Sequence, residues 1–427
     1  MQTGYTGYVD RSEWWWTILV SLIFLLFTFS PFIIIAITTP SQPNMQIMGG
    51  IHDFRNSAVL LAHMQQGMDG NILTNFLYTA SHTTPTLIYP LYSALGQLER
   101  FVGLPLNILF HVVRIFTAFF MYLTIYHLGA SIWVKIRTRR IFFILASISG
   151  GLGWLIFFLI GNNAINSTPI VEVLVPQAFP IHAGAANIHY PLAIACLALL
   201  AAAIIPILRP GTTELPSAEN AGSVVFITSL LLSLIYPEAL LPLGIAYTLN
   251  ILINWYNKKT LIMREWQWGL WILVPALPII TYQFLSYNLN PSIALWFDQR
   301  SATTPPLISI MWGVFIPLII AIPGLIRAFR RFEADGDRFM LLWLLSIVIV
   351  SQLPLPIKQY ALMGILFPIA YFATRSIEDF WFDYIRRRHR IRVTVIFVPI
   401  LVLSHLLWIF APVVPIVLGW QGYGNML

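Results

Sequence analysis

Ionisable side chains gather in one stretch of a chain that is otherwise poor in them. Only 10% of the 427 residues are charged. Residues 46–103 nevertheless contain eight ionisable side chains: His52, Asp53, Arg55, His63, Asp69, His82, Glu99 and Arg100. A carboxylate can remove a proton from a hydroxyl group as a general base, and guanidinium groups bind phosphate. This stretch therefore contains the residue types that proton transfer beside a phosphate group requires.

The elements that must position these residues are membrane-spanning helices. The chain is 58% hydrophobic with a mean hydropathy of +0.77, and apolar runs close to the ~20 residues of a membrane span recur along it. We expect eleven spans, at residues 15–39, 105–129, 141–161, 190–208, 223–236, 239–255, 268–287, 306–329, 339–353, 360–374 and 393–418. The sequence thus predicts an all-α, polytopic integral membrane protein, with residues 1–427 in a single transmembrane domain and no soluble C-terminal domain.

Two pairs of these apolar runs are short. The runs on either side of residues 237–238 and of residues 354–356 are 14 to 17 residues long, whereas a full crossing takes ~20 residues. These runs could be partial or broken helices that line a cavity.

The distribution of basic residues predicts the orientation of the chain. With the N-terminus inside, nineteen of the 24 Lys and Arg residues fall on the cytoplasmic side, four on the opposite side, and one, Arg114, within a span. This bias follows the positive-inside rule, so we expect a multi-pass plasma-membrane protein with a cytoplasmic N-terminus and an external C-terminus. The rule also accounts for the net charge of +7, and we expect no nucleic-acid partner.

Residues 40–104 form the first external loop in this arrangement. Apolar residues recur at near-helical spacing over residues 52–66 and 89–102, which predicts two interfacial helices. Residues 68–86 carry Gly, Asn and Thr, and we expect them to be irregular. Asp53 then lies where the first span leaves the membrane, although its side chain could simply cap the first interfacial helix.

Several stretches of the first 130 residues match a known pattern: residues 49–55, 67–78, 85–92 (PTLIYPLY), Gly96 and 111–114 (HVVR). In these stretches the chain resembles the GT-C superfamily of membrane glycosyltransferases, which includes protein mannosyltransferases and aminoarabinose transferases. Members share an acidic residue just after the first span, in a long external loop with two interfacial helices. Residues 175–189 and 364–371 are similar to segments of large uncharacterised bacterial members.

The resemblance implies that the chain moves a sugar from a polyprenyl-phosphate carrier to a lipid, glycan or protein acceptor at the external face. In an inverting transfer, a carboxylate takes the acceptor proton while cations stabilise the leaving phosphate. Asp53 is the candidate base. The candidate phosphate ligands are the external cations Arg55, Arg100, Arg300 and Lys358, for which snorkelling at the membrane surface is the alternative.

The further candidates for substrate contacts are His52, His82, Arg114, Glu172 and His189. A charge within a span, such as Arg114, usually faces a cavity or a partner, and Glu99, Glu172 or Glu238 could be that partner. The external histidines, together with Asp53 and Glu172, could supply a divalent metal site. No HxH or HxxxH spacing accompanies them.

Two other functions stay open at this point. Asp53 lacks the neighbouring carboxylate that many superfamily members carry, so the chain could be a non-catalytic subunit that scaffolds a larger membrane complex. A transporter would use the short runs as broken helices, but the ionisable residues lie in an external loop rather than in mid-span. The expected partners are a polyprenyl-phosphate-linked sugar, membrane lipids and, for the scaffold, other subunits of a membrane complex.

Overall fold

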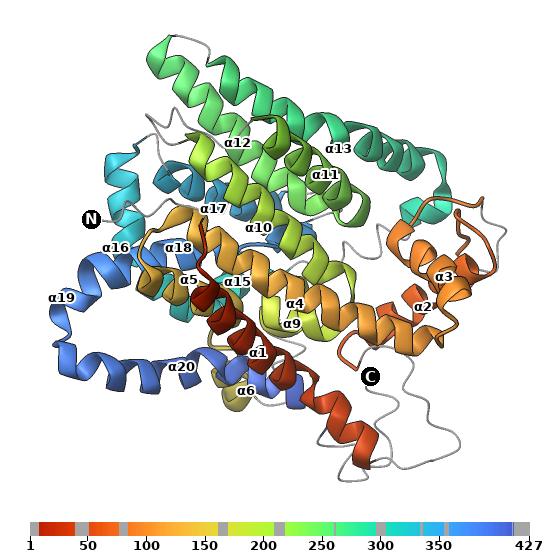
Figure 1. Cartoon of the computed structure of the whole chain (residues 1–427), viewed down its shortest axis with the longest axis horizontal. Helices are drawn as coiled ribbons and strands as arrows, with labels where there is room; N and C mark the ends of the chain where they lie inside the picture. The colour runs from red at the N-terminus through yellow and green to blue at the C-terminus, as the bar shows by residue number, and fades with distance from the viewer. Residues whose placement is uncertain are drawn as a thin grey trace.

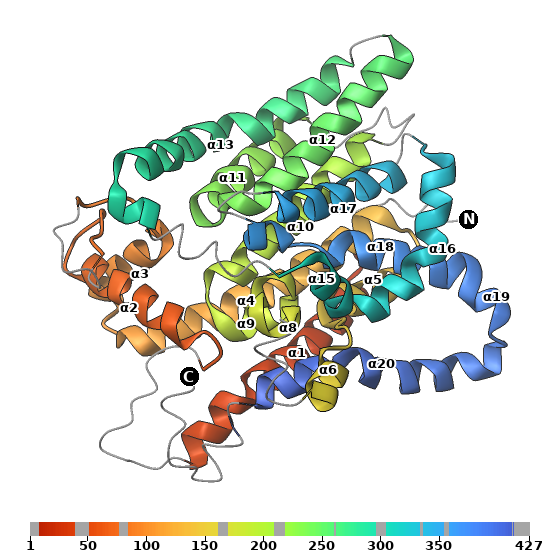
Figure 2. The ribbon, with the colours of Figure 1, turned by 180° about the vertical axis from the view of Figure 1, so that it is seen from behind.

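The computed structural model describes residues 8–38, 51–76, 84–160, 170–208, 218–259, 262–295, 305–333, 336–353, 358–411 and 413. Within these residues the fold is built from helices (Figures 1 and 2). The one β-type pairing among them is an isolated antiparallel bridge between Thr74 and Thr86. The prediction of an all-α protein is confirmed.

Eight helices in the described part of the chain are long and apolar enough to cross a membrane. Six are continuous: α1 (Arg11–Thr38), α4 (Leu106–Ile132), α10 (His189–Leu208), α12 (Pro237–Lys258), α13 (Met263–Leu289) and α20 (Arg387–Phe410). The other two combine shorter helices, and the first joins α5 (Ile136–Ile148) to α6 (Gly153–Ile160). The second runs through η2 (Lys358–Leu362), α18 (Leu366–Ser376), η3 (Ile377–Trp381) and α19 (Phe382–Tyr384). The chain is therefore a multi-pass membrane protein by the length and composition of its helices.

The run at residues 306–329, expected as one span, is two helices in the structure. Helices α15 (Leu307–Gly313) and α16 (Phe315–Arg331) meet at an angle of 93°. The carbonyl group of Trp312, at the bend, accepts a hydrogen bond from the backbone N–H of Leu152 at 3.0 Å. A contact with a distant segment thus accompanies the break in the helix.

The run at residues 141–161 is interrupted in a related way. Between α5 and α6 the backbone N–H of Gly150 donates to the carbonyl group of Leu401 at 2.9 Å. A side chain on the neighbouring Gly151 would lie only 1.9 Å from the oxygen of Trp312. Two glycines therefore let α20 and α15 approach the interrupted span closely.

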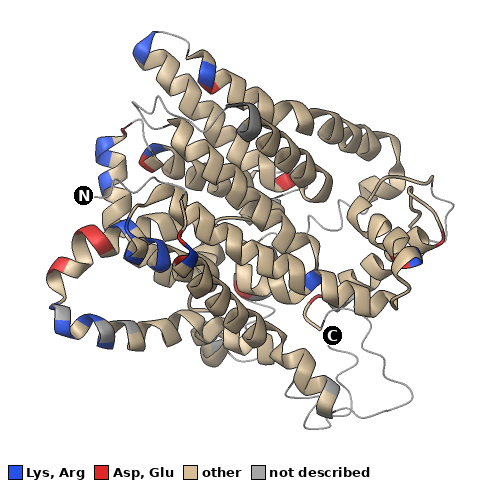
Figure 3. Cartoon of the chain, in the orientation of Figure 1, with Lys and Arg blue, Asp and Glu red and all other residues tan. Residues whose placement is uncertain are grey.

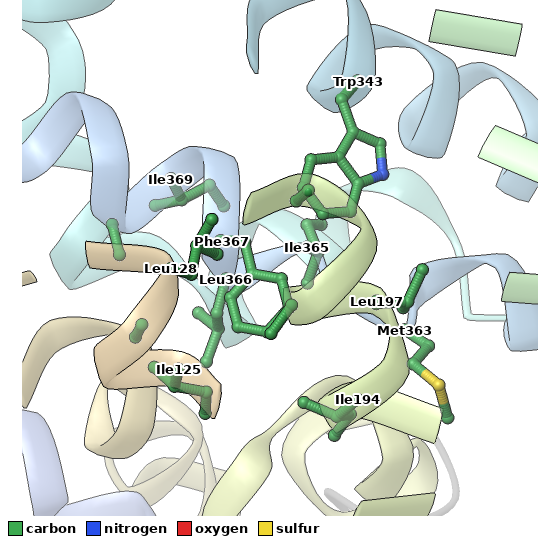
Figure 4. Close-up of a cluster of buried hydrophobic side chains, with 14 of the residues drawn as sticks. Ile125, Leu128, Ile194, Leu197, Trp343, Met363, Ile365, Leu366, Phe367 and Ile369 are labelled. Carbon is green, nitrogen blue, oxygen red and sulfur yellow. The ribbon is translucent and has the colours of Figure 1, made fainter. Parts of the chain in front are cut away.

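The centre of the bundle is filled by aromatic and aliphatic side chains from helices that are distant in sequence. Figure 4 shows Phe367 of α18 between Leu128 of α4 and Leu197 of α10, with Trp343 nearby. Trp343 belongs to α17 (Gly336–Gln352) and is fully buried. One connected cluster of buried side chains extends from α1 to α20, so these helices share a single core.

The first loop contains the two helices that its sequence predicts. Helix α2 (Phe54–Met68) and helix α3 (Pro90–Val102) pack against each other beside one end of the bundle (Figures 1 and 2). At their crossing, a Cβ atom on Gly67 or Gly96 would lie 2.1 or 1.9 Å from a backbone oxygen of the other helix. The pair is fixed to α4 by a small apolar cluster around Met64, Tyr92 and Phe110.

Basic side chains are distributed unevenly along the bundle. Figure 3 shows that most Lys and Arg residues gather toward the end of the helices that holds the N-terminus. Two buried or partly buried ion pairs lie among these residues, between Arg139 and Glu13 at 3.0 Å and between Arg375 and Asp337 at 2.9 Å. The loop helices α2 and α3 lie toward the opposite end (Figure 1).

Candidate functional site

Asp53 is held by one side chain of its own helix and by two side chains from a distant part of the chain. It occupies the N-cap position of α2, but its side chain makes no capping hydrogen bond to that helix. Its Oδ2 atom instead accepts hydrogen bonds from the Asn187 amide at 2.5 Å and from the Tyr190 hydroxyl at 3.5 Å. Its Oδ1 atom accepts one from the Asn56 amide at 2.8 Å. The alternative in which Asp53 merely caps its helix is therefore wrong.

The segment that brings Asn187 to Asp53 lies between two helices. Helix α9 (Pro180–Ala186) ends immediately before Asn187, which has an extended backbone, and α10 begins two residues later. Asn187 is fully buried, and its amide oxygen accepts a hydrogen bond from the Ser57 hydroxyl at 3.0 Å. Both ends of the Asn187 amide group thus bind the start of α2, and Asn187 itself lies just before α10.

Arg114 fixes the same segment from the other side. Its guanidinium group is fully buried and donates to the carbonyl oxygens of Ala185 at 2.6 Å and Ala186 at 3.1 Å. It also lies over the rings of Phe29 and Phe32, at 4.7 and 4.2 Å from their centroids. Carbonyl dipoles and aromatic faces therefore compensate the buried charge. These groups, rather than the carboxylates of Glu99, Glu172 or Glu238, are the observed partners of Arg114.

His52 is packed against the bundle beside Asp53. Its ring stacks on Trp408 of α20, with centroids 4.2 Å apart and planes inclined by 20°. Burial, together with the charge of Arg114, lowers the pKa of His52 to about 3, so its ring is neutral at pH 7. His182 stacks on the same Trp408 ring system at 4.0 Å and shares a 2.8 Å hydrogen bond with His405. These histidines are therefore engaged in packing and hydrogen bonding.

His189 lines a cavity next to the Asp53 cluster. Its Nδ1 atom shares a 2.7 Å hydrogen bond with the Tyr92 hydroxyl of α3. The cavity has a volume of ≈ 100 Å³ and lies between the start of α3, the junction of α11 (Ala218–Ile235) with α12, and α13. Tyr190 connects the two features, because its hydroxyl group reaches Asp53 and its ring lies 6.0 Å from that of Tyr236 in the cavity wall.

Two candidate residues lie apart from this cluster. Glu172, in α8 (Val171–Leu174), accepts hydrogen bonds from the backbone N–H groups of Gly151 and Gly153 at 3.2 and 3.1 Å. It therefore caps the start of α6, and burial raises the pKa of its carboxyl group. Arg100 is exposed near the end of α3, where its guanidinium group lies over Gly70. The structure does not bring either residue into the group around Asp53.

The remaining candidates fall outside what the structure describes. His82 and Arg300 lie outside the described residues, and so do the side chains of Arg55 and Lys358. Among the described residues, no group of three or more His, Cys, Asp or Glu side chains is placed to hold a metal ion. His63, one of the histidines considered for such a site, instead packs its ring against Tyr89 at 5.5 Å.

Sequence reasoning missed the residues that hold Asp53, namely Asn187, Asn56, Ser57 and Tyr190. A signal for Asn187 was present, since it is the one amide side chain in the sequence HAGAANIHY, where most of its neighbours are small and apolar. Its partner could not be identified, because 134 positions separate the two residues.

The sequence matches no protein-family model, and no curated protein is significantly similar to it.

Proposed function

We propose that this chain is an inverting membrane glycosyltransferase that uses a polyprenyl-phosphate-linked sugar. The observation that carries the proposal is the placement of Asp53. A partly exposed carboxylate at the start of α2, the helix that follows the first long apolar helix in the sequence, is oriented by three side chains and is linked through Tyr190 to a cavity lined with aromatic and polar residues. Oriented carboxylates beside a cavity are the common arrangement for general-base chemistry.

The proposed reaction transfers the sugar in one displacement. The hydroxyl oxygen of a lipid, glycan or protein acceptor attacks the anomeric carbon, and the bond from that carbon to the phosphate oxygen breaks. Asp53 takes the hydroxyl proton, and polyprenyl phosphate leaves with the bonding electrons. Arg55, Arg300 and Lys358 stay the candidate cations for the phosphate. Arg100 and Arg114 do not, because one is remote from Asp53 and the other is enclosed by carbonyl groups and rings.

The proposal includes a topology of eleven crossings in a bacterial plasma membrane. The three crossings beyond the eight long helices would be α11, α17 and the bent pair of α15 and α16. The N-terminus would be cytoplasmic, the C-terminus external, and α2 and α3 would lie at the external surface. The gathering of Lys and Arg toward the N-terminal end of the bundle supports this orientation (Figure 3).

The experiment that tests the proposal is a transfer assay with defined donors. Membrane vesicles containing the overexpressed chain would receive polyprenyl phosphate carrying radiolabelled glucose, mannose or aminoarabinose. We expect label to move from at least one carrier to another lipid, a glycan or a protein, above vesicles with an empty vector. If no donor is consumed and the chain purifies with stoichiometric membrane partners, the scaffold function replaces the transferase.

A further inference from the structure

The cavity beside His189 has an aromatic wall with restrained ring positions. Tyr236 and Tyr282 face it from the α11–α12 junction and from α13, and Tyr89 faces it from the start of α3. The hydroxyl oxygen of Tyr282 accepts a hydrogen bond from the backbone N–H of Leu87 at 2.9 Å. The Tyr89 and His189 rings lie 5.9 Å apart. A wall fixed in this way loses little conformational entropy when a ligand binds.

Tyr89 adopts a backbone conformation that is costly for its residue type. Its φ and ψ angles are 52° and 51°, in the left-handed region. A bulky residue rarely occupies this region, and the residue before a proline, here Pro90, normally has an extended backbone. Such strain persists where the surrounding structure imposes it, and it is concentrated at binding sites. In Tyr89 the strained residue is also a residue of the cavity wall.

The charges around the cavity favour an uncharged ligand. The described residues that line it include one carboxylate, Glu238, and no Lys or Arg. A phosphate group would meet a like charge there, and the described lining residues supply no cation to compensate it. A carboxylate accepts hydrogen bonds from hydroxyl groups, and Gln283 and Ser286 offer further polar groups nearby.

The combination of aromatic faces and hydroxyl-binding groups is suited to a sugar ring. The C–H groups of a pyranose carry partial positive charge and can lie against the negative faces of aromatic rings, while its hydroxyl groups donate to acceptors. A cavity of ≈ 100 Å³ is smaller than the ~300–1,000 Å³ of drug-sized sites. It therefore suits one sugar residue rather than the long polyprenyl chain.

We propose that this cavity, walled by Tyr89, Tyr236 and Tyr282 with Glu238 as hydrogen-bond acceptor, is a binding subsite for one uncharged sugar residue. The assignment rests on the proposed function for its link to transfer, since Tyr190 joins the cavity to Asp53. The sugar could belong to the carrier or to a glycan acceptor, and both present the same chemistry to the cavity.

Direct binding tests the assignment without requiring turnover. Saturation-transfer NMR would be recorded on the full chain in lipid nanodiscs, with the methyl glycosides of glucose, mannose and galactose, and with glucuronate as a charged probe. We expect at least one neutral glycoside to bind and glucuronate to bind more weakly. Tyr282→Ala and Glu238→Gln should each weaken binding about tenfold, the effect of losing one good contact.

Matched variants separate the cavity from general damage to the fold. Tyr256→Ala removes an exposed tyrosine of α12, and Glu99→Gln neutralises a carboxylate of α3 outside the cavity. Both should bind the glycoside as the unaltered chain does. The assignment is overturned if no neutral glycoside binds, or if Tyr282→Ala and Glu238→Gln, eluting as monodisperse protein, bind it unchanged.

Two additional arms separate this assignment from the proposed function and identify the source of the sugar. Asp53→Asn should retain glycoside binding. Glycoside binding by the unaltered chain, together with an absence of sugar transfer by that chain, would remove the transferase and leave the subsite. Sugar-loaded polyprenyl phosphate should displace the glycoside if the subsite holds the donor sugar, and a glycan acceptor should displace it if it holds the acceptor. Equal displacement by bare polyprenyl phosphate would overturn the assignment, because the ligand would then be the phosphate.

Discussion

At the scale of single residues, the position of Asp53 is determined by its partners rather than by its own helix. The sequence predicts a carboxylate at the exit of the first span. In the structure Asp53 lies at the start of α2, and residues 39–50, which connect α1 to this region, lie outside the described residues. Two of the three partners that orient it come from a distant part of the chain, Asn187 from the segment between α9 and α10 and Tyr190 from the first turn of α10. Periodicity in the sequence indicates which face of a helix is buried, but it does not indicate which distant residue lies against that face. The contact between Asp53 and Asn187 depends on how the helices pack, so no local sequence pattern predicts it.

Arg114 illustrates the same limit, because the sequence identified an unusual charge but not its partners. We predict that Arg114→Met lowers stability by about 2–3 kcal/mol, since the carbonyl oxygens of Ala185 and Ala186 lose a charged donor in a buried site. Thermal unfolding of the purified protein measures the change, with exposed Arg100→Met as the control expected to change little. Loss of transfer without loss of stability would make Arg114 a substrate ligand instead.

His63 predicts a pH dependence of stability. It is 2% exposed on α2, and burial lowers its pKa from 6.5 to about 4. Between pH 6.5 and about pH 4, the unfolded chain therefore holds a proton on His63, whereas the folded chain does not. The free energy of unfolding falls as the pH drops through this window. At pH 5 the cost is about 2 kcal/mol.

Substitution of His63 isolates this contribution. His63→Phe keeps a ring against Tyr89 but cannot bind a proton, so its melting temperature should fall less than that of the unaltered chain between pH 7 and pH 5. Parallel profiles for His63→Phe and the unaltered chain would contradict the prediction.

At the scale of elements, the long apolar helices, helices α2 and α3 and the break before Pro237 followed from the sequence, but the bend within residues 306–329 did not. In the sequence, residues 306–329 read as one continuous apolar run. The bend at Trp312 accompanies a hydrogen bond from Leu152, which lies in another part of the chain, and the run itself carries no sign of that contact. Helices α11 and α12 are longer than the runs predicted for them. Pro237 occupies the first turn of α12, where a missing N–H costs little, and so it starts this helix.

The crossing of α2 and α3 predicts the effect of a small change. Gly96→Ala would place a Cβ atom 1.9 Å from the Met64 carbonyl oxygen, so the helices must separate. We expect a loss of about 1–3 kcal/mol, as for other overpacked contacts, seen as a lower melting temperature. Gly244→Ala, whose new Cβ would meet Leu273 at 3.8 Å, is the matched control and should not destabilise. Equal stability of the two variants would refute the close crossing.

At the scale of the whole molecule, the proposed orientation predicts the side on which each loop lies. An alkaline phosphatase fused after residue 427 should be active, because this enzyme folds only outside the cytoplasm. A green fluorescent protein inserted at residue 213 or 334 should fluoresce, because this protein folds inside the cytoplasm. Opposite results at the C-terminus alone would mean that one of the segments counted as crossing, such as the bent pair of α15 and α16, does not cross.

The central claim is that Asp53 removes the acceptor proton, and the rate of sugar transfer by Asp53→Asn tests it most directly. Asparagine preserves the shape of the side chain but cannot act as the base, so the initial rate with the best polyprenyl-phosphate donor should fall at least ~100-fold. Asp69→Asn, which alters an exposed carboxylate at the end of α2, should transfer at the rate of the unaltered chain. An undiminished rate for Asp53→Asn, with normal rates for the control, would contradict the account.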